Sequence, residues 1–386
     1  MSNTTLIPSQ RHLFDIPKHI AYFNSAYNSP QLNESRQRLH EGVDSKSHPW
    51  NRSSESFFGD ADKIRTLAAK LFGYTADGYA IVPAASYGVS SAARIIEPLL
   101  KKNDVILHVA EEFPSNVLPW KRLVKETSCT LATVDYPHDG DWTNAIINKL
   151  DKNIKVVAVS SCHWTNGALI DLERLGDACR ANGSIFVVDA TQSLGAMPLS
   201  VEKVKADFLV SSGYKWLLCP YGFSLLYVAE HWRNSRPLEE TWLSRHNAGD
   251  FTALVKYSDD YMPGSQRFDV GEKCTATILP GAIAALEQIL EWGVENVAHS
   301  LEKINDNIGI NLEKLGFTLP HKSLRCPHMF GAILPTHFTG NLVSELKSRN
   351  IFVSQRGNSI RFAPHLHIND ADVERLISAL TDLVTK

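Results

Sequence analysis

The chain has 386 residues, a formal net charge of −3 at pH 7, and 44% hydrophobic and 21% charged residues. This balance is typical of ordinary soluble globular proteins, and it excludes disordered, collagen-like and coiled-coil classes. The small negative charge, without a dense run of lysine and arginine, gives no general attraction to nucleic acid. We therefore expect a small-molecule ligand and no nucleic-acid partner.

The stretch MSNTTLIPSQRHLFDIP at the start of the chain has neither a basic leader nor an apolar core, so it does not resemble a signal peptide. No uninterrupted apolar run approaches the roughly 18 residues that a membrane span needs. We expect a cytoplasmic protein with no membrane partner. The six cysteines form no CxxC pair, which argues against a disulfide framework or a thiolate zinc site, and we predict no metal site.

Short β-branched runs alternate with helical patterns from about residue 80 to about residue 230. The predicted strands are DVILHVA from Asp104, IKVVAVSS from Ile154, SIFVVDA from Ser184, DFLVSS from Asp207 and FSLLYV from Phe223. Between them, LERLGDACRANG has the pattern of a helix that ends at Gly183. Continuous hydrophobicity predicts a mostly parallel sheet covered by helices on both faces, with ligands at the carboxyl ends of its strands.

The last third of the chain has a different pattern. LPGAIAALEQILEWGVENV predicts one long helix opened by Pro280, and the stretch from 233 to 266 before it has no clear pattern and reads as a long excursion. AILPTHF predicts a strand, NLVSELKSRN a helix, IFVSQRGNSIRFAP a hairpin, and the residues after Asn369 a final helix. We expect a large domain at 20–285 and a small α+β domain at 286–386, with residues 1–19 packed on the small domain.

Polar residues follow two neighbouring predicted strands. VVDATQS places Asp189 and Gln192 after one strand, and VSSGYKW places Ser212, Tyr214 and Lys215 after the next. A pyridoxal phosphate enzyme needs a lysine that forms a Schiff base and a carboxylate that keeps the ring nitrogen of the cofactor protonated. A simple strand-end ion pair is the alternative. The chain contains neither GxxxxGK[ST] nor a GxGxxG that opens a helix, which argues against a nucleotide site.

VVDATQSLGAMPLSV and DFLVSSGYKWLLCPYGFSLLYV resemble the core signature of the class V aminotransferase family. These are fold type I pyridoxal phosphate enzymes, and they include cysteine desulfurases, kynureninase and isopenicillin N epimerase. Four further stretches resemble family motifs in the same order: IVPAASYGVSSAARII, EEFPSNVLPW, SSCHWTNGALIDL and IRFAPHLHIND. The resemblance covers nearly the whole chain and implies pyridoxal 5'-phosphate as cofactor.

The resemblance assigns roles to individual residues. Lys215 forms the Schiff base and later moves the α-proton, while Asp189 pairs with the pyridinium nitrogen. Phe113 stacks on the ring, although it also suits an ordinary core position. The remaining implied contacts are Gln192 to the ring hydroxyl, Ser86, Ser212 and Tyr214 to the phosphate, and His163 and Asn166 beneath the cofactor, with Asn166 reaching the substrate.

Two arginines compete for the α-carboxylate of the substrate, because a guanidinium gives a planar carboxylate two parallel hydrogen bonds. A two-residue hairpin loop would pair Arg356 with Ser359 and Arg361 with Ser354, placing both arginines on one face. The family position favours Arg361, and Arg356 stays open as the alternative. RFDVGEKCTAT, from Arg267 to Thr277, resembles the loop that completes the site of a partner subunit, which implies a homodimer.

The reaction is less closely defined than the cofactor. We expect an enzyme that acts on an α-amino acid, with transamination as the leading reaction and C–S lyase, β-elimination or epimerase chemistry as the alternative. Cysteine desulfurases of the family carry a nucleophilic cysteine shortly before the terminal arginine, and NLVSELKSRNIFVSQRGNSIR contains none. A catalytically idle sensor or assembly subunit is the alternative of another class. The substrate side chain is not defined by any motif.

Overall fold

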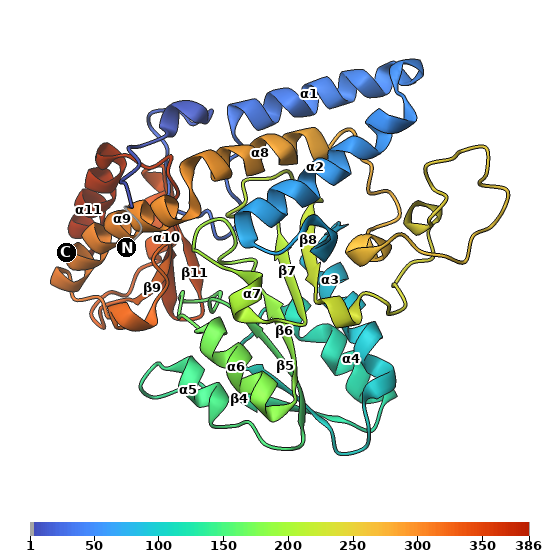
Figure 1. Cartoon of the computed structure of the whole chain (residues 1–386). Coiled ribbons are helices and arrows are strands. Elements are labelled where there is room, and N and C mark those ends of the chain that lie inside the picture. Colours follow the sequence, from blue (N-terminus) through green and yellow to red (C-terminus); the bar gives the residue numbers. More distant parts are fainter. Residues whose placement is uncertain (1–3, 386) are drawn as a thin grey trace.

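The structure is a computed structural model that describes residues 4–385, apart from the side chains of residues 54 and 55. Its largest sheet has seven strands, in the order β2-β8-β7-β6-β5-β3-β4 within these residues (Figure 1). The strands are β2 (Tyr79–Val82), β3 (Val105–Val109), β4 (Thr130–Val134), β5 (Ile154–Ser160), β6 (Ile185–Asp189), β7 (Phe208–Ser212) and β8 (Ser224–Val228). Neighbours from β7 to β4 are parallel, and β8 is antiparallel to β7 and β2. The predicted mostly parallel α/β sheet is confirmed.

The strands are hydrophobic along their whole length because helices cover both faces of the sheet. Every residue of β2, β6, β7 and β8 is buried. One apolar core joins one face to α2, α6 and α8, and a second core joins the other face to α3 and α4. The helices of this body are α1 (Asn33–Ser47), α2 (Ser54–Phe72), α3 (Ala85–Ile96), α4 (Leu118–Glu126), α5 (Trp142–Ile147), α6 (Leu172–Asn182), α7 (Val201–Val204) and α8 (Leu279–Trp292).

The C-terminal part of the chain builds a smaller α+β body beside the sheet (Figure 1). Its elements are β9 (Phe330–Ile333), β10 (Ile351–Phe352), β11 (Ser354–Arg356), β12 (Ser359–Phe362), α9 (Val294–Lys314), α10 (Leu342–Ser348) and α11 (Asp370–Val384). The hairpin has the predicted register, with Ser354 opposite Arg361 and Arg356 opposite Ser359. The N-terminal segment contacts this body: the Gln10 amide donates to the Leu366 carbonyl, and Arg11 pairs with buried Asp372.

Two expectations about this region need correction. The predicted single helix is two helices, α8 and α9, because Gly293 adopts φ 75° between them. The boundary at residue 20 is also misplaced, since β1 (Ala21–Tyr22) pairs in parallel with β10, and Phe23 packs in the core of the smaller body. The predicted domain boundary between residues 285 and 286 stays a prediction. Residues 1–3 and 386, which the predicted division includes, lie outside the described residues.

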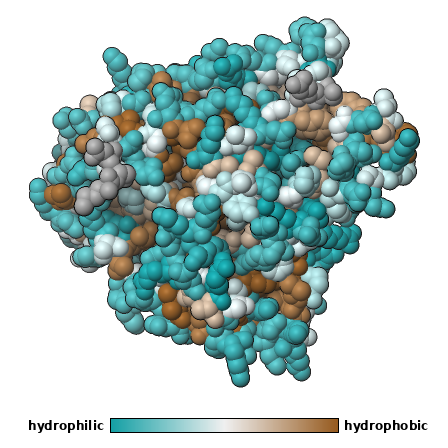
Figure 2. Space-filling view, viewed as in Figure 1, coloured by the Kyte–Doolittle hydropathy of each residue, from teal (hydrophilic) through white to brown (hydrophobic). Residues whose placement is uncertain are grey.

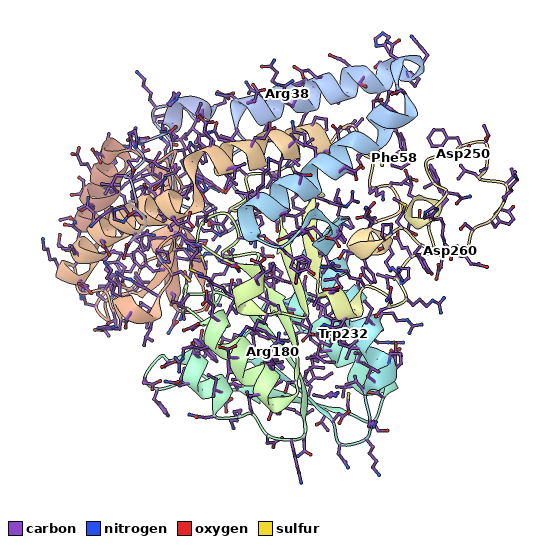
Figure 3. The ribbon with its side chains drawn as sticks, viewed as in Figure 1. Arg38, Phe58, Arg180, Trp232, Asp250 and Asp260 are labelled. Atoms are coloured by element: carbon purple, nitrogen blue, oxygen red, sulfur yellow. The ribbon has the colours of Figure 1, made fainter. Side chains whose placement is uncertain are left out.

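The excursion from 233 to 266 projects from the side of the molecule (Figure 1). It lies near the N-terminal end of α2, where Phe58 is found, and it carries Asp250 and Asp260 (Figure 3). The rings of Phe57 and Phe251 are 6.0 Å apart in an edge-to-face arrangement, so an aromatic contact holds the excursion against α2.

Hydrophilic residues cover most of the face shown in Figure 2, and apolar residues lie in small groups among them. None of the helices described is long and apolar enough to cross a bilayer.

The segment from Arg267 to Thr277 is tied to the sheet by a buried charge cluster. The Asp269 carboxylate pairs with Arg65 of α2 and, at 2.7 Å, with Lys273, and these three side chains are at most 2% exposed. The other oxygen of Asp269 accepts the Ile81 amide of β2 at 2.8 Å. A single carboxylate therefore compensates two buried cations and fixes the start of this segment.

Replacing Asp269 should destabilise the fold strongly. Asp269→Asn keeps the shape of the side chain but leaves Arg65 and Lys273 without a buried counter-charge, and we expect a loss of about 3–5 kcal/mol in unfolding free energy. The control is Asp62→Asn, because Asp62 also pairs with Arg65 but is 66% exposed, and this change should cost less than about 1 kcal/mol. Urea unfolding measures both, and equal losses would contradict the assigned role of Asp269.

Candidate active site

A small cavity lies at the carboxyl ends of β5, β6 and β7. Its lining consists of Ala85, Glu112, Phe113, Ser160, Trp164, Asp189, Thr191, Gln192, Ser212, Tyr214 and Lys215. The register of the sheet explains why these residues meet, because Ser160 lies opposite Asp189, and Asp189 lies opposite Val210 of β7. The cavity is therefore at the strand ends where ligands of parallel sheets bind.

Lys215 lies in a tight turn that follows β7. The Gly213 amide donates to the Phe223 carbonyl, the Leu218 amide donates to the Lys215 carbonyl, and a side chain at position 213 would lie within 2.8 Å of the Phe223 oxygen. The close packing of this turn leaves the Lys215 side chain only 6% exposed. Burial lowers the pKa of the Lys215 amine to about 8, although Asp189 acts in the opposite direction.

Asp189 ends β6 and is also buried. Its Oδ1 atom accepts the Thr191 amide at 2.9 Å. Burial raises the pKa of Asp189, and the Thr191 contacts and the charge of Lys215 only partly offset this effect. A carboxyl in this position is stabilised in its charged form by any cation that occupies the cavity.

Aromatic rings flank the amine of Lys215. Its Nζ lies 5.4 Å from the ring centre of Phe113 and 5.7 Å from that of Tyr214. The Trp164 ring meets the Phe113 ring edge-to-face, with 5.5 Å between the ring centres. These flat surfaces suit a planar aromatic ligand held between the lysine and the strand ends.

Gln192, Thr191 and Ser212 supply the neutral polar groups of the cavity. The Gln192 side chain is fixed at both ends, because its Oε1 accepts the Trp216 indole N–H at 2.9 Å and its Nε2 donates to the Ala26 carbonyl at 3.1 Å. The Thr191 hydroxyl accepts the Ser212 amide at 3.0 Å. The cavity therefore presents hydroxyl and amide groups in positions that the surrounding structure determines.

Arg361 reaches toward the same region from β12. It is 1% exposed, and its Nη1 donates to the Trp164 carbonyl at 2.5 Å. Its Nε and Nη2 atoms are buried and have no hydrogen-bond partner among the described residues. Burial lowers the pKa of Arg361 to about 9, and the nearby charge of Arg356 acts in the same direction. Two unsatisfied donors on one buried guanidinium indicate a place for an anionic group.

Arg356 is the less constrained of the two arginines. It is partly exposed, its guanidinium lies 5.6 Å from the ring centre of Trp164, and its Nη1 donates to the Gln355 carbonyl. Both arginines thus flank Trp164, as their shared face of the hairpin predicts.

Besides Arg361 and Arg356, three predicted residues lie outside the lining of this cavity. Ser86 is exposed in the first turn of α3, next to Ala85, which does line it. His163 is fully buried and stacks on Trp142, and its nitrogens contact the Ala110 carbonyl and the Thr165 hydroxyl. These contacts commit both ring nitrogens to neighbours, which suits a positioning role better than a cofactor contact.

Asn166 is the third residue outside the lining. Its Oδ1 accepts the Ala168 amide at 3.0 Å, and its carbonyl accepts the Gly331 amide of β9 at 2.7 Å. Its side chain lines a separate surface cavity between the loop around Tyr136 and the small body. A substrate contact by Asn166 remains a prediction.

Sequence reasoning missed several residues of the cavity, of which Glu112 is the most unusual. It is buried, and it accepts the Phe113 amide, the Ser160 amide and the Ser160 hydroxyl. Burial raises the pKa of Glu112 to about 7, partly opposed by these hydrogen bonds. Its position directly before Phe113 was the feature of the sequence that could have identified it as a site residue. Trp164, Thr191 and Ser160 carried no signal of their own, because their role depends on the register of three strands.

The sequence is similar to several curated proteins. It is 34% identical over 193 residues to a probable cysteine desulfurase of Pyrococcus abyssi, an alignment that covers 50% of this chain and 46% of that protein. It is 24% identical over 324 residues to the uncharacterized aminotransferase YcbU of Bacillus subtilis, covering 82% of each chain. The chain thus spans about half the length of the first relative and most of the second.

Solved structures share the fold of the whole chain. The apo structure of a cysteine desulfurase from Thermococcus onnurineus NA1 has a TM-score of 0.84 at 20% identity and covers 98% of this chain and 99% of that one. A mutant of C-DES with glycine covalently linked to its PLP cofactor has a TM-score of 0.88 at 17% identity and covers 97% and 99%. These likenesses confirm the predicted fold class.

The family model described as Aminotransferase class-V matches residues 44–372. This range contains all of the motif stretches in full, and the last of them, IRFAPHLHIND, ends at Asp370. The match confirms the resemblance and the cofactor inferred from those motifs. The chain therefore belongs to the aminotransferase class-V family of pyridoxal phosphate-dependent enzymes.

Proposed function

We propose that the protein acts on an α-amino acid, with Lys215 as the residue that holds pyridoxal phosphate and moves the α-proton. The observation that carries this proposal is the buried pair of Lys215 and Asp189 at one cavity, with the two free donors of Arg361 nearby. A buried amine, a buried carboxylate and a buried guanidinium at one place are costly to a fold unless a ligand compensates them.

The donor set of the cavity fits the cofactor. Asp189 is buried, and the charge of Lys215 only partly offsets the rise in its pKa; a protonated ring nitrogen would stabilise the charged carboxylate further. Phe113 would stack on the ring, Gln192 would contact its hydroxyl, and Ser212 and Tyr214 would contact the phosphate. The first turn of α3, with Ser86, would add backbone amides for the dianion. When bound, the cofactor accepts the electron pair released as a bond to the α-carbon of the substrate breaks.

Lys215 has the properties of a base at this site. Because burial lowers the pKa of its amine to about 8, much of it is unprotonated near that pH, and an unprotonated amine can accept a proton. The positive charges of Arg361 and Arg356 contribute to this lowering. Arg361 would bind the carboxylate of the substrate with its Nε and Nη2 atoms and so orient the α-carbon toward Lys215.

Transamination is the leading reaction. C–S elimination is the second candidate, because relatives of the chain include probable cysteine desulfurases and a structural neighbour is a cystine C–S lyase, C-DES. All six cysteines are buried, and none lines the Lys215 cavity. An elimination here would therefore proceed without a cysteine thiol that accepts sulfur.

Two further sequence-based proposals concern assembly and location. We retain a homodimer in which the segment from Arg267 to Thr277 approaches the site of the partner, and a cytoplasmic location. Support for assembly comes from Tyr221, which is 75% exposed while its ring lies 4.5 Å from that of the cavity residue Tyr214. An exposed aromatic beside the cavity suits coverage by a second subunit.

Borohydride reduction should attach the cofactor permanently to Lys215, because a reduced carbon–nitrogen bond does not hydrolyse. Peptide mass mapping of the reduced protein should find the adduct on the peptide that contains Lys215. The adduct should be lost in Lys215→Ala and kept in Lys205→Ala, where the replaced lysine is on the surface. Absence of an adduct on Lys215 in the wild-type protein would overturn the proposal.

A panel of amino acids should identify the reaction. We expect at least one amino acid to change the absorbance of the bound cofactor and to give a keto acid only when a keto-acid acceptor is present. Pyruvate and ammonia formed without an acceptor would instead select elimination, with sulfide assayed separately for sulfur-containing substrates. If no amino acid changes the spectrum, the idle sensor becomes the better hypothesis.

Arg361 and Arg356 can be separated by their effects on substrate binding. Arg361→Gln should raise KM about 100-fold, equivalent to about 2.7 kcal/mol, because it removes a buried charged donor pair. Arg356→Gln should raise KM only a few-fold, since its side chain is partly exposed. Cofactor content should be unchanged in both variants. The opposite ranking of the two KM values would assign the clamp to Arg356.

A further inference from the structure

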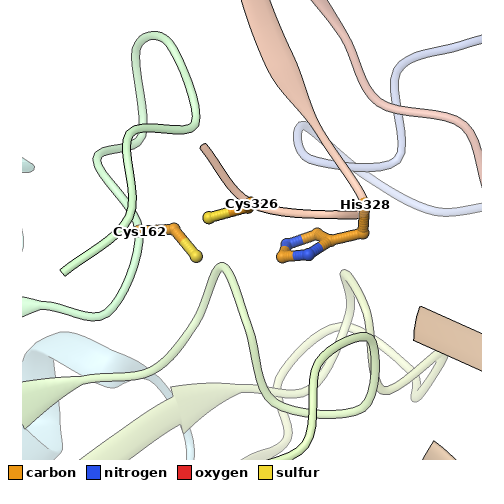
Figure 4. A group of neighbouring side chains, drawn as sticks. All are labelled: Cys162, Cys326 and His328. Atoms are coloured by element: carbon orange, nitrogen blue, oxygen red, sulfur yellow. The ribbon is translucent and has the colours of Figure 1, made fainter. Parts of the chain in front are cut away.

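Cys162, Cys326 and His328 form a cluster outside the Lys215 cavity. One ligand atom from each residue lies within 4.8 Å of the others, and all three side chains are at most 2% exposed. Figure 4 shows the two thiols and the imidazole facing one another across a small gap. Neither the proposed reaction nor the cofactor uses any of these groups.

We propose that this cluster binds one zinc ion. Two thiolates and an imidazole are ligands that zinc prefers, with Zn–S distances of about 2.3 Å and Zn–N distances of about 2.0–2.1 Å. Two tetrahedral sulfur ligands would be about 3.8 Å apart by that geometry. The cluster, whose ligand atoms lie within 4.8 Å, therefore needs shifts of only about 1 Å to close around the ion.

Charge balance favours zinc over a monovalent ion. Two thiolates neutralise a divalent cation, whereas a cuprous ion with the same ligands would leave a negative charge in an apolar interior. A water molecule would complete the tetrahedron.

The hydrogen bonding of the His328 imidazole is typical of histidines that bind zinc. Its Nε2 contacts the Gln192 carbonyl, so the neutral ring carries its proton there and has its lone pair on Nδ1. Nδ1 is buried and has no hydrogen-bond partner among the described residues. In metal-binding histidines, one ring nitrogen usually donates its proton to a carbonyl or carboxylate. This hydrogen bond fixes the tautomer and leaves the other nitrogen free to bind the metal.

Cys326 borders a surface cavity of about 340 Å³ whose wall includes the carboxylates of Glu302 and Asp306. Acidic groups at the opening attract cations, although Lys322 pairs with both of them. Zinc could therefore reach Cys326 without passing through the Lys215 cavity.

The site would join distant parts of the fold. Cys162 follows β5 of the large sheet, and Cys326 and His328 precede β9 of the small body. Through the Gln192 carbonyl, His328 contacts a residue of the Lys215 cavity. Bound zinc would thus clamp the small body to the segment that carries Gln192.

Metal content of the cofactor-loaded protein tests the proposal. The protein is reduced to keep the thiols free, stripped with a chelator, dialysed against zinc and analysed by mass spectrometry for metal. We expect about one zinc per chain, and an affinity at least about 100-fold lower in Cys326→Ser and in His328→Gln. The control is Cys179→Ser, which replaces another buried cysteine that is not part of the cluster and should bind zinc as the wild-type protein does.

A second measurement uses the wild-type protein, so its result does not depend on whether the variants fold. Cobalt in place of zinc should produce a sulfur-to-cobalt charge-transfer band, and X-ray absorption should show two sulfur neighbours. Less than a tenth of a zinc per chain, a bound metal without sulfur neighbours, or equal binding by Cys326→Ser would each overturn the proposal. These readouts do not involve the reaction, so they stand apart from the tests of the proposed function.

Discussion

The buried amine of Lys215 is the feature on which the site depends. An ammonium that is 6% exposed carries a desolvation cost, and Asp189 is the carboxylate that compensates it most directly. The cost shows in both groups, because burial lowers the pKa of the lysine and raises that of the aspartate. A ligand that bonds to the amine and brings a cation to the carboxylate relieves both. The strand ends around them are arranged to admit a flat ligand.

The small body contributes a second charge to the same region. Arg361 extends from β12 to the Trp164 carbonyl of the large body. The approach is close because β9 has glycine at position 331, where a side chain would lie within 3.0 Å of Asn166. The pairing of the Gly331 amide with the Asn166 carbonyl places the hairpin, and hence Arg361, relative to the cavity. The position of the guanidinium is therefore a property of the contact between the two bodies.

Much of the fold could be predicted because its signals are local. The five predicted strands are buried on both faces, so their runs are continuously apolar, and Gly183 ends α6 in the left-handed conformation that its position suggested. The edge strand β4 is partly exposed, so its apolar pattern was too weak to predict. The break between α8 and α9 was missed because a glycine within an apolar helical pattern is often tolerated, and here φ 75° makes it a turn.

The residues of the candidate site were also only partly predictable from the sequence. Lys215, Asp189, Gln192, Ser212 and Phe113 were named from the sequence because their motifs are contiguous, and the structure brings them to one cavity. Glu112 was missed because its contacts come from a neighbouring strand, and Ser86 and His163 were named although neither lines the cavity.

The sequence by itself determined the family, the cofactor and the chemical groups at the strand ends, since these depend on residue types at short spacing. Only the tertiary structure decided which arginine is buried with free donors, and that Cys162 meets Cys326 and His328. Both depend on contacts between segments far apart in the chain, which no local pattern records.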